Sequence, residues 1–529
     1  MAHSISDIHR RLAPFLVTGL SGTELTAGER ELLSQAPPAG VILFYRNVES
    51  IDQLQRLTGE VNGIIESASG LPPLIMADHE GGRISVLARA IGAPPSQMAI
   101  GQSGGKVLVP RILGRTARRM KRCGINLTLS PVADVNSEPL KPVIGTRSFG
   151  EDPESVSGAV REAVRTIAEE GMLSCLKHFP GHGATVFDSH LTLPTIGKTI
   201  EELQEVEFPP FVAGIEEGAD TVLTAHIALS EGDPPASLDR RIVTGLLREK
   251  LGFEGVVITD ALEMAGVLPD GKAMSSIDPG AADDKAAGAV PAAVIRRALE
   301  AGNDLMLMSR PIGEVYDEIA EYEASLSDIS QDEASAARIT MLRKRVDTAS
   351  LDTSGDDTDD DSEPLSNFAV FSIPNEREYG FPKEIRPVFT GWKRDFDDYV
   401  VRRFISRVFE GLDRAGLRPG PVPDLDRPEP VRLDDGSESG LYTLGQAGWT
   451  GSGKVLFLLC RKSPPEEIIR DAALGCEAVV VAARPWDAGM LPDDIPLIIT
   501  YGIYDGAADQ VGDVLGGSGW RVPGEPPAT

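Results

Sequence analysis

The chain has 529 residues, which is too long for one ordinary hydrophobic core and predicts at least two domains. Its formal charge of −29 argues against nucleic acid or an anionic membrane surface as a partner. The four cysteines show no CxxC spacing, the first residues lack the apolar core of a signal peptide, and no apolar run reaches membrane-spanning length. We therefore expect a soluble α/β protein located in the cytoplasm.

Short apolar runs alternate with longer segments of helical periodicity as far as about residue 348. The expected strands are residues 15–17, 40–44, 74–77, 126–130, 173–177, 220–225, 255–259 and 304–308. The expected helices are residues 51–67, 107–121, 154–170, 200–217 and 287–301. Eight strands with helices between them predict a (β/α)8 TIM barrel, although an open doubly wound sheet would give the same alternation.

Polar side chains follow six of these eight strands, and in a barrel they would all open onto one face, where catalytic groups are found. This pattern favours a closed barrel with a site at its mouth over an open sheet. In chain order the polar groups are Arg46 and Asn47, Asp78 with His79 and Glu80, Asp134 and Asn136, Lys177 and His178, His226, and Asp260.

The most unusual stretch is residues 176–190, which holds three of the seven histidines of the chain. It begins as a buried strand and then becomes a polar loop in which proline and glycines stop regular structure. A metal site is one interpretation, with the ligand set His178, His182, Asp188 and His190. The chain has no HExxH pattern, however, and Lys177 would repel a cation, so no metal and no cofactor are expected.

Two acidic residues suggest acid–base and covalent chemistry. Asp188 lies two residues before His190, close enough to orient the imidazole and raise its basicity. His190 could then donate and withdraw a proton near neutral pH. Asp260 follows the apolar run 256–259, and a carboxylate at a strand end, facing that pair, would suit a covalent nucleophile. An ordinary loop-start carboxylate is the alternative interpretation for Asp260.

Residues 350–364 contain seven acidic residues and no apolar residue after Leu351, which is typical of a solvated linker. We divide the chain into a barrel domain (1–349), an acidic linker (350–366) and a smaller α/β, sandwich-like domain (367–529). In the last domain, residues 455–459, 478–482 and 497–501 predict parallel strands, and residues 418–453 predict long loops. Helices are expected at 395–417, 465–474 and 507–515.

Several motifs together resemble glycoside hydrolase family 3, in its β-N-acetylglucosaminidase branch. Lys-His-Phe-Pro-Gly-His-Gly at 177–183, followed by Asp-Ser-His at 188–190, is similar to the signature of that branch. Further family blocks, in family order, are similar to residues 40–47, 78–83, 126–134, 147–153, 224–226 and 251–264. The resemblance covers about residues 12–310, and the last part of the chain, from about 497 to 515, resembles the C-terminal domain of longer members.

The resemblance implies a retaining exo-glycosidase that removes non-reducing-end N-acetylglucosamine from muropeptides or chitooligosaccharides through a glycosyl-enzyme. It implies that Asp260 is the nucleophile and that His190, oriented by Asp188, is the acid/base. The residues that it implies for substrate binding are Asp78, Arg147, Lys177, His178 and His226. The partner is then a GlcNAc-containing carbohydrate, and the second domain is expected to be structural, to shape the cleft rim or to mediate a homodimer.

Two positions depart from the family pattern: His79 stands where a Gln is usual, and Val86 stands where many members have an Arg that contacts the sugar. A neutral imidazole acid/base would not repel phosphate, so phosphorolysis of β-N-acetylglucosaminides stays open beside hydrolysis. Three further interpretations of the chain are a β-glucosidase-type member of the family, a metal-dependent hydrolase and an inactive sugar-binding protein.

Overall fold

The computed structural model describes most of the first 346 residues and short segments beyond them. The described residues are 5–102, 105–137, 144–183, 193–267, 290–326 and 332–346, followed by 386–392, 405, 408, 429–432, 438–444, 454–458, 478–481 and 497–499. Within these residues no helix is both long and apolar enough to cross a membrane. The predicted acidic linker lies outside the described residues, and the domain division at 350–366 stays a prediction.

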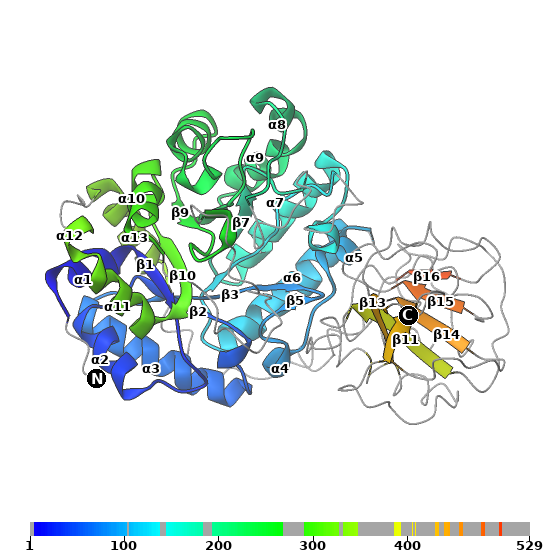
Figure 1. Cartoon of the computed structure of the whole chain (residues 1–529), viewed down its shortest axis with the longest axis horizontal. Helices are drawn as coiled ribbons and strands as arrows, with labels where there is room; N and C mark the ends of the chain where they lie inside the picture. Colours follow the sequence, from blue (N-terminus) through cyan, green and yellow to red (C-terminus); the bar gives the residue numbers. More distant parts are fainter. Residues whose placement is uncertain are drawn as a thin grey trace.

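Two parallel sheets form the centre of the first 346 residues (Figure 1). The first has the order β10 (Met306–Pro311), β1 (Leu16–Gly19), β2 (Gly40–Leu43), β3 (Leu74–Ala77) and β6 (Leu127–Thr128). The second has the order β7 (Cys175–Phe179), β8 (Thr221–Thr224) and β9 (Val256–Thr259). Parallel bridges link Leu127 to Leu173 and Ile258 to Leu305, so each end of the second sheet is connected to an end of the first.

These strands form because they are short apolar runs that are buried on both faces, as parallel sheets covered by helices require. The eight strand predictions are confirmed, and β3 has the predicted bounds. At β7 the prediction is wrong at its end, because the strand continues through His178 to Phe179, with a register shift between Lys177 and Phe179. The hairpin of β4 (His79–Gly81) and β5 (Ile84–Ser85) was not predicted.

Helices surround the two sheets (Figure 1). Their ends follow local sequence signals. In α3 (Ile51–Ser69), the Ser50 side chain accepts from the amide of Gln53, and Gly70 ends the helix with φ 73°. The other α-helices are α1 (Asp7–Leu12), α2 (Ala27–Gln35), α4 (Ala88–Ile91), α5 (Gln97–Gln102), α6 (Gly105–Arg122), α7 (Pro153–Glu169), α8 (Ile200–Val206), α9 (Phe208–Glu216), α10 (Ala292–Ala301), α11 (Ile312–Glu321), α12 (Glu323–Leu326) and α13 (Glu333–Lys344).

One predicted helix is divided in two. Residues 200–217 have helical periodicity throughout, but α8 ends at Val206 and α9 begins at Phe208, next to Pro209 and Pro210. Proline lacks an amide hydrogen and is best tolerated in the first turn of a helix, so a new helix starts there. Glu207, at the junction, is fully buried, and this brings its carboxylate beneath the loop that follows β7.

The last part of the chain contains a six-stranded sheet with the order β12-β13-β11-β14-β15-β16. The predicted parallel strands are present as β14 (Lys454–Leu458), β15 (Ala478–Val481) and β16 (Leu497–Ile499). The prediction of loops over 418–453 is wrong, because β12 (Glu429–Arg432) and β13 (Glu438–Leu444) lie there, and β13 runs antiparallel to β11 (Arg386–Trp392). The α/β class with parallel sheets is therefore confirmed for the described part of the first 346 residues. The predicted helices at 465–474 and 507–515, and nearly all of the one at 395–417, lie outside the described residues.

Candidate active site

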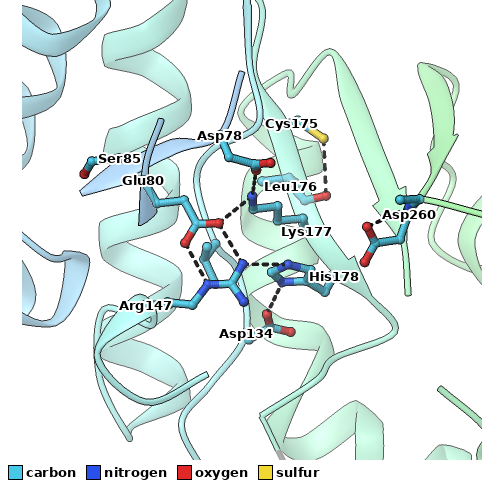
Figure 2. A network of polar contacts seen from close by, with 12 residues as sticks. Asp78, Glu80, Ser85, Asp134, Arg147, Cys175, Leu176, Lys177, His178 and Asp260 are labelled. Atoms are coloured by element: carbon cyan, nitrogen blue, oxygen red, sulfur yellow. Dashed lines mark hydrogen bonds and ion pairs between the residues drawn. The ribbon is translucent and has the colours of Figure 1, made fainter. Parts of the chain in front are cut away.

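The candidate site lies where several strands of the two parallel sheets end. Asp78 follows β3, Glu80 lies in β4, and Lys177 and His178 lie in β7. Arg147 comes from η3 (Gly145–Arg147), Asp134 from the segment after β6, and Asp260 directly follows β9. Figure 2 shows these side chains in one place, with the Asp260 carboxylate turned toward Lys177 and His178. The predicted residues Asp78, Arg147, Lys177, His178 and Asp260 are thus brought together.

Lys177 and Arg147 are held by one carboxylate, that of Glu80. The Lys177 Nζ lies 2.5 Å from Asp78 Oδ1 and 2.5 Å from Glu80 Oε1. Arg147 binds Glu80 in a bidentate manner, at 2.8 Å from Nε to Oε2 and 2.7 Å from Nη2 to Oε1. The Lys177 and Glu80 side chains are only 2% and 1% exposed. Buried charges of this kind persist only when paired, so Glu80 fixes both cations.

The charges of this cluster keep Glu80 ionised. Burial alone would raise its pKa, but the adjacent charges of Arg147 and Lys177 lower the pKa of Glu80 to about 2. Burial likewise opposes the charge on Lys177, whereas Asp78 and Glu80 favour it, and the net effect is a raised pKa for Lys177. The two cations therefore stay charged across the ordinary pH range.

His178 has an unusual backbone and two partners at its ring. Its φ is 125°, in a region that residues other than glycine rarely adopt, so the backbone is strained here. The ring Nδ1 lies 2.6 Å from Asp134 Oδ2, and the ring Nε2 lies 2.9 Å from Arg147 Nη2. The other oxygen of Asp134 accepts from the His182 amide at 2.6 Å. A strained, fixed histidine at the end of a strand is typical of a functional site.

Asp260 is placed by backbone contacts. Its amide donates to the Thr224 carbonyl at 2.9 Å, and its Oδ1 accepts from the Ala261 amide at 2.8 Å. The residue is half-buried, so its other oxygen can meet a ligand. His226 is fully buried behind it: Nδ1 lies 2.7 Å from Ser237 Oγ and Nε2 lies 2.9 Å from the Ala261 carbonyl. His226 thus contacts the turn that follows Asp260.

The remaining sequence candidates have different surroundings. Asp188 and His190 lie outside the described residues. His182 is buried, with its ring edge-on to that of His178 at 6.1 Å between centroids. Arg46 donates to the carbonyl oxygens of Leu20 and Ser309 at 2.8 and 2.7 Å. Through these contacts Arg46 connects the segment after β1 to β10.

The two departures from the family pattern are both buried. His79 accepts from the Leu87 amide through Nδ1 at 3.3 Å, and burial lowers its pKa to about 3, so the ring is neutral. Val86 is 1% exposed, and its amide donates to the Asp78 carbonyl at 2.9 Å. Val86 therefore offers no polar group to a ligand. In the described part of the chain, no cluster of three or more His, Cys, Asp or Glu side chains is arranged to hold a metal ion.

Glu80 and Asp134 were recognised in the sequence only as polar residues after strands, without a role. The structure makes both of them central: Glu80 joins the two cations, and Asp134 joins His178 to the loop at His182. Paired carboxylates and cations beside a strand-end aspartate, at the carboxyl ends of parallel strands, are typical of the active sites of α/β enzymes.

The comparisons with known proteins agree with this class. Residues 15–347 match the family described as Glycosyl hydrolase family 3 N terminal domain, and the chain belongs to this family. A protein named beta-hexosaminidase from Stenotrophomonas maltophilia (strain K279a) is 34% identical over 303 residues, which are 56% of this chain and 83% of that protein. A beta-hexosaminidase from Xanthomonas oryzae pv. oryzae (strain KACC10331 / KXO85) is 35% identical over 271 residues, covering 48% of this chain and 77% of the relative.

Two solved structures are also similar. A glycoside hydrolase family 3 beta-N-acetylglucosaminidase from Paenibacillus sp. str. FPU-7 has a TM-score of 0.77 at 25% identity, covering 99% of this chain and 98% of that chain. NagZ from Neisseria gonorrhoeae, in complex with N-trifluoroacetyl-D-glucosamine, has a TM-score of 0.53 at 29% identity, covering 62% of this chain and 89% of that chain. The first likeness extends over nearly the whole chain, and the second over about three fifths of it.

Proposed function

We propose that this chain is a retaining exo-β-N-acetylglucosaminidase, which releases N-acetylglucosamine from the non-reducing ends of short glycans. The observation that carries the proposal is Asp260, whose carboxylate faces the cluster of paired cations and carboxylates in the site (Figure 2). Such an array offers charged donors and acceptors to the hydroxyl groups of a sugar while placing a nucleophile beside it. Membership of glycoside hydrolase family 3 and relatives named beta-hexosaminidase support the same conclusion.

The mechanism that we propose has two steps. Asp260 attacks the anomeric carbon, the bond from that carbon to the leaving oxygen breaks, and His190 gives its proton to that oxygen. Water then attacks the glycosyl-enzyme while His190 takes the proton, which releases the sugar and regenerates Asp260. Asp188 orients His190. Asp78, Arg147 and Lys177 bind the sugar hydroxyl groups, His178 lies among them, and His226 holds the turn that follows the nucleophile.

We also infer that the two parallel sheets close into one (β/α)8 barrel. The bridges at both ends of the second sheet support this inference, as do the hydrogen bonds from Thr128 N to Leu173 O and from Thr259 N to Leu305 O, each 2.9 Å long. In a closed barrel the carboxyl ends of all strands meet at one mouth. That geometry accounts for Asp260, which follows β9, facing side chains at the ends of β3 and β7, although β3 belongs to the other sheet.

The substrate class that we propose is muropeptides or chitooligosaccharides, and the place of action is the cytoplasm. The ligand bound to the Neisseria NagZ, an N-acylated glucosamine, supports an acetamido sugar at the site. The described cysteines, Cys123 and Cys175, are free and buried, as in proteins of reducing compartments. The sequence-based roles for the second domain, a structural part, a cleft rim or a homodimer contact, stay open.

The test is turnover of an aryl β-N-acetylglucosaminide and an aryl β-glucoside, each with and without inorganic phosphate. We expect preference for the acetamido sugar and no acceleration by phosphate. Sugar 1-phosphate as the product would make the enzyme a phosphorylase.

A second test replaces the proposed nucleophile. Asp260→Ala should lower kcat by at least about 1,000-fold, because the covalent step is lost, whereas Asp52→Ala, at an exposed site in α3, should have no effect. Undiminished turnover by Asp260→Ala would exclude the proposed mechanism.

A further inference from the structure

The buried carboxylate of Asp134 has two donors and no contact with solvent. It is 0% exposed, Oδ2 faces the ring Nδ1 of His178 at 2.6 Å, and Oδ1 accepts from the His182 amide at 2.6 Å. One carboxylate thus spans the strained residue at the end of β7 and the start of the loop after it. Nothing in the proposed two-step mechanism uses Asp134, so its burial calls for another explanation.

The partner on the other side of the ring determines the protonation of His178. Arg147 Nη2 lies 2.9 Å from Nε2, and a guanidinium group can only donate hydrogen bonds. Nε2 must therefore accept, and it carries no proton. A neutral imidazole has one N–H, so that proton lies on Nδ1 and is donated to Asp134.

The same constraint applies to Asp134 itself. Burial, together with the charges of Glu207 and Glu80, raises the pKa of the Asp134 carboxyl well above its ordinary value, although the His182 amide and the charge of Arg147 oppose this. The hydrogen-bond geometry nevertheless favours the ionised form. A protonated Asp134 would have to donate to Nδ1, which would move the imidazole proton to Nε2, against the donor of Arg147. The hydrogen-bond pattern is complete only with Asp134 as the carboxylate.

We infer that Asp134 is a positioning residue that, together with Arg147, holds His178 as the neutral Nδ1–H tautomer and ties it to the loop at His182. The one lone pair of Nε2 then faces Arg147, so a sugar hydroxyl that meets this nitrogen must donate its hydrogen there in place of Arg147. This inference deepens the proposed function and rests on it for its effect on turnover. The tautomer itself follows from the geometry alone.

The first experiment observes the tautomer directly in the wild-type protein. Protein labelled with ¹⁵N only at histidine gives separate nitrogen shifts for protonated and unprotonated ring nitrogens, and loss of one set in His178→Gln assigns the signals. We expect a protonated Nδ1 and an unprotonated Nε2 at His178 near neutral pH. A protonated Nε2 would overturn the inference, whatever the substrate of the enzyme proves to be.

The second experiment is Asp134→Asn. An amide has one acceptor oxygen, so either the His178 ring or the His182 amide must face an NH₂ group instead of an acceptor. We expect kcat/KM for the aryl β-N-acetylglucosaminide to fall roughly 10- to 100-fold, as when other carboxylates that orient an imidazole are lost, and the ring nitrogen shifts of His178 to change. A folded variant that keeps kcat/KM within about twofold would contradict the inference.

Asp220→Asn is the matched control. Asp220 is also buried, and its Oδ2 accepts from the Ser174 amide at 2.8 Å, but it lies at the amino-terminal ends of the strands, away from the site. We expect this variant to lose stability without changing kcat/KM or the His178 signals. If Asp134→Asn does not fold, the nitrogen shifts of His178 in the wild-type protein still test the inference. If the wild type turns over no acetamido sugar, the proposed function fails while the tautomer measurement remains valid.

Discussion

Glu80 shows what a single buried residue contributes and why it was missed. Its two partners are far away in the sequence: Arg147 is 67 positions further on, and Lys177 belongs to a different sheet. Sequence patterns place Glu80 and Lys177 at strand ends, but they do not say which strand ends face each other or that Arg147 binds Glu80. Pairing depends on the arrangement of the sheets, and the pairing is what distinguishes Glu80 from an ordinary loop-start carboxylate.

Glu80→Gln should damage both stability and activity. It removes the charge that the buried Lys177 and the part-buried Arg147 share, and breaking a buried ion pair by removing one partner typically costs about 3–5 kcal/mol. It also frees Arg147 and Lys177 to move from the positions that a sugar would meet. We expect a lower melting temperature and a fall in kcat/KM of roughly 100-fold, measured by thermal denaturation and by turnover of an aryl β-N-acetylglucosaminide.

Glu60→Gln provides the comparison for that change. Glu60 also binds an arginine in a bidentate manner, but the Arg30 and Glu60 side chains are 45% and 38% exposed. Exposed ion pairs contribute little, so this variant should stay within about 0.5 kcal/mol of the wild type and keep full activity. Equal losses in the two variants would mean that the burial of Glu80 does not matter.

At the level of elements, the strands were predictable and their partners were not. Apolar runs of about five residues correctly predicted the strands because each must be buried on both faces. Their exact ends depend on tertiary contacts: β7 continues through His178 only because Asp134 and Arg147 hold that residue in a strained conformation. The β4–β5 hairpin was missed because its strands are three and two residues long.

Replacing glycine with alanine at two positions, Gly183 and Gly158, should have opposite effects on stability because the surroundings of the two glycines differ. At Gly183, in the loop after β7, an added Cβ would overlap the backbone carbonyl of Val135, which cannot move without displacing the Asp134 segment. At Gly158, in the middle of α7, an added Cβ meets nothing within 4 Å. We therefore expect Gly183→Ala to lower both the melting temperature and kcat/KM, and Gly158→Ala to stabilise by about 0.5–1 kcal/mol.

The measurement for this pair is thermal denaturation together with turnover of the aryl substrate. Alanine replaces glycine in both variants, so a difference between them reports the local environment and not the change in backbone entropy alone. A Gly183→Ala protein with wild-type stability and activity would show that the loop can shift at little cost, and that Val135 does not fix its path.

At the scale of the whole molecule, the sequence pattern predicted the fold class but did not predict all strands of the six-stranded sheet in the last part of the chain. The alternation of strands and helices correctly indicated an α/β protein with parallel sheets. In the last part of the chain, β12 and β13 contain Pro430 and Gly440, residues that sequence rules assign to loops. Their strand conformation depends on the pairing of β13 with β11 and of β12 with β13, which local sequence does not reveal.

Stability as a function of pH should depend on two buried glutamates with opposite shifts. Glu80, with its pKa lowered to about 2, contributes stability above pH 4.5 that is lost as the pH falls toward 2. For Glu263, burial raises the pKa to about 7, although Arg310 partly offsets this effect. Its contribution is therefore fully present below about pH 4.5 and is lost as the pH rises through 7.

Glu263→Gln isolates the second effect. The shift from 4.5 to about 7 corresponds to about 3 kcal/mol of unfolding free energy between pH 4.5 and pH 8, because burial opposes the ionised form. Glutamine keeps the shape and an acceptor for the Arg310 amide, which lies 3.3 Å from Oε1, but does not titrate. At pH 5 the variant and the wild type should melt at similar temperatures, and at pH 8 the variant should melt roughly 5 °C higher, at equal scan rates. A difference that stays constant between pH 5 and pH 8 would show that Glu263 does not titrate in this range, and that its pairing with Arg310 outweighs its burial.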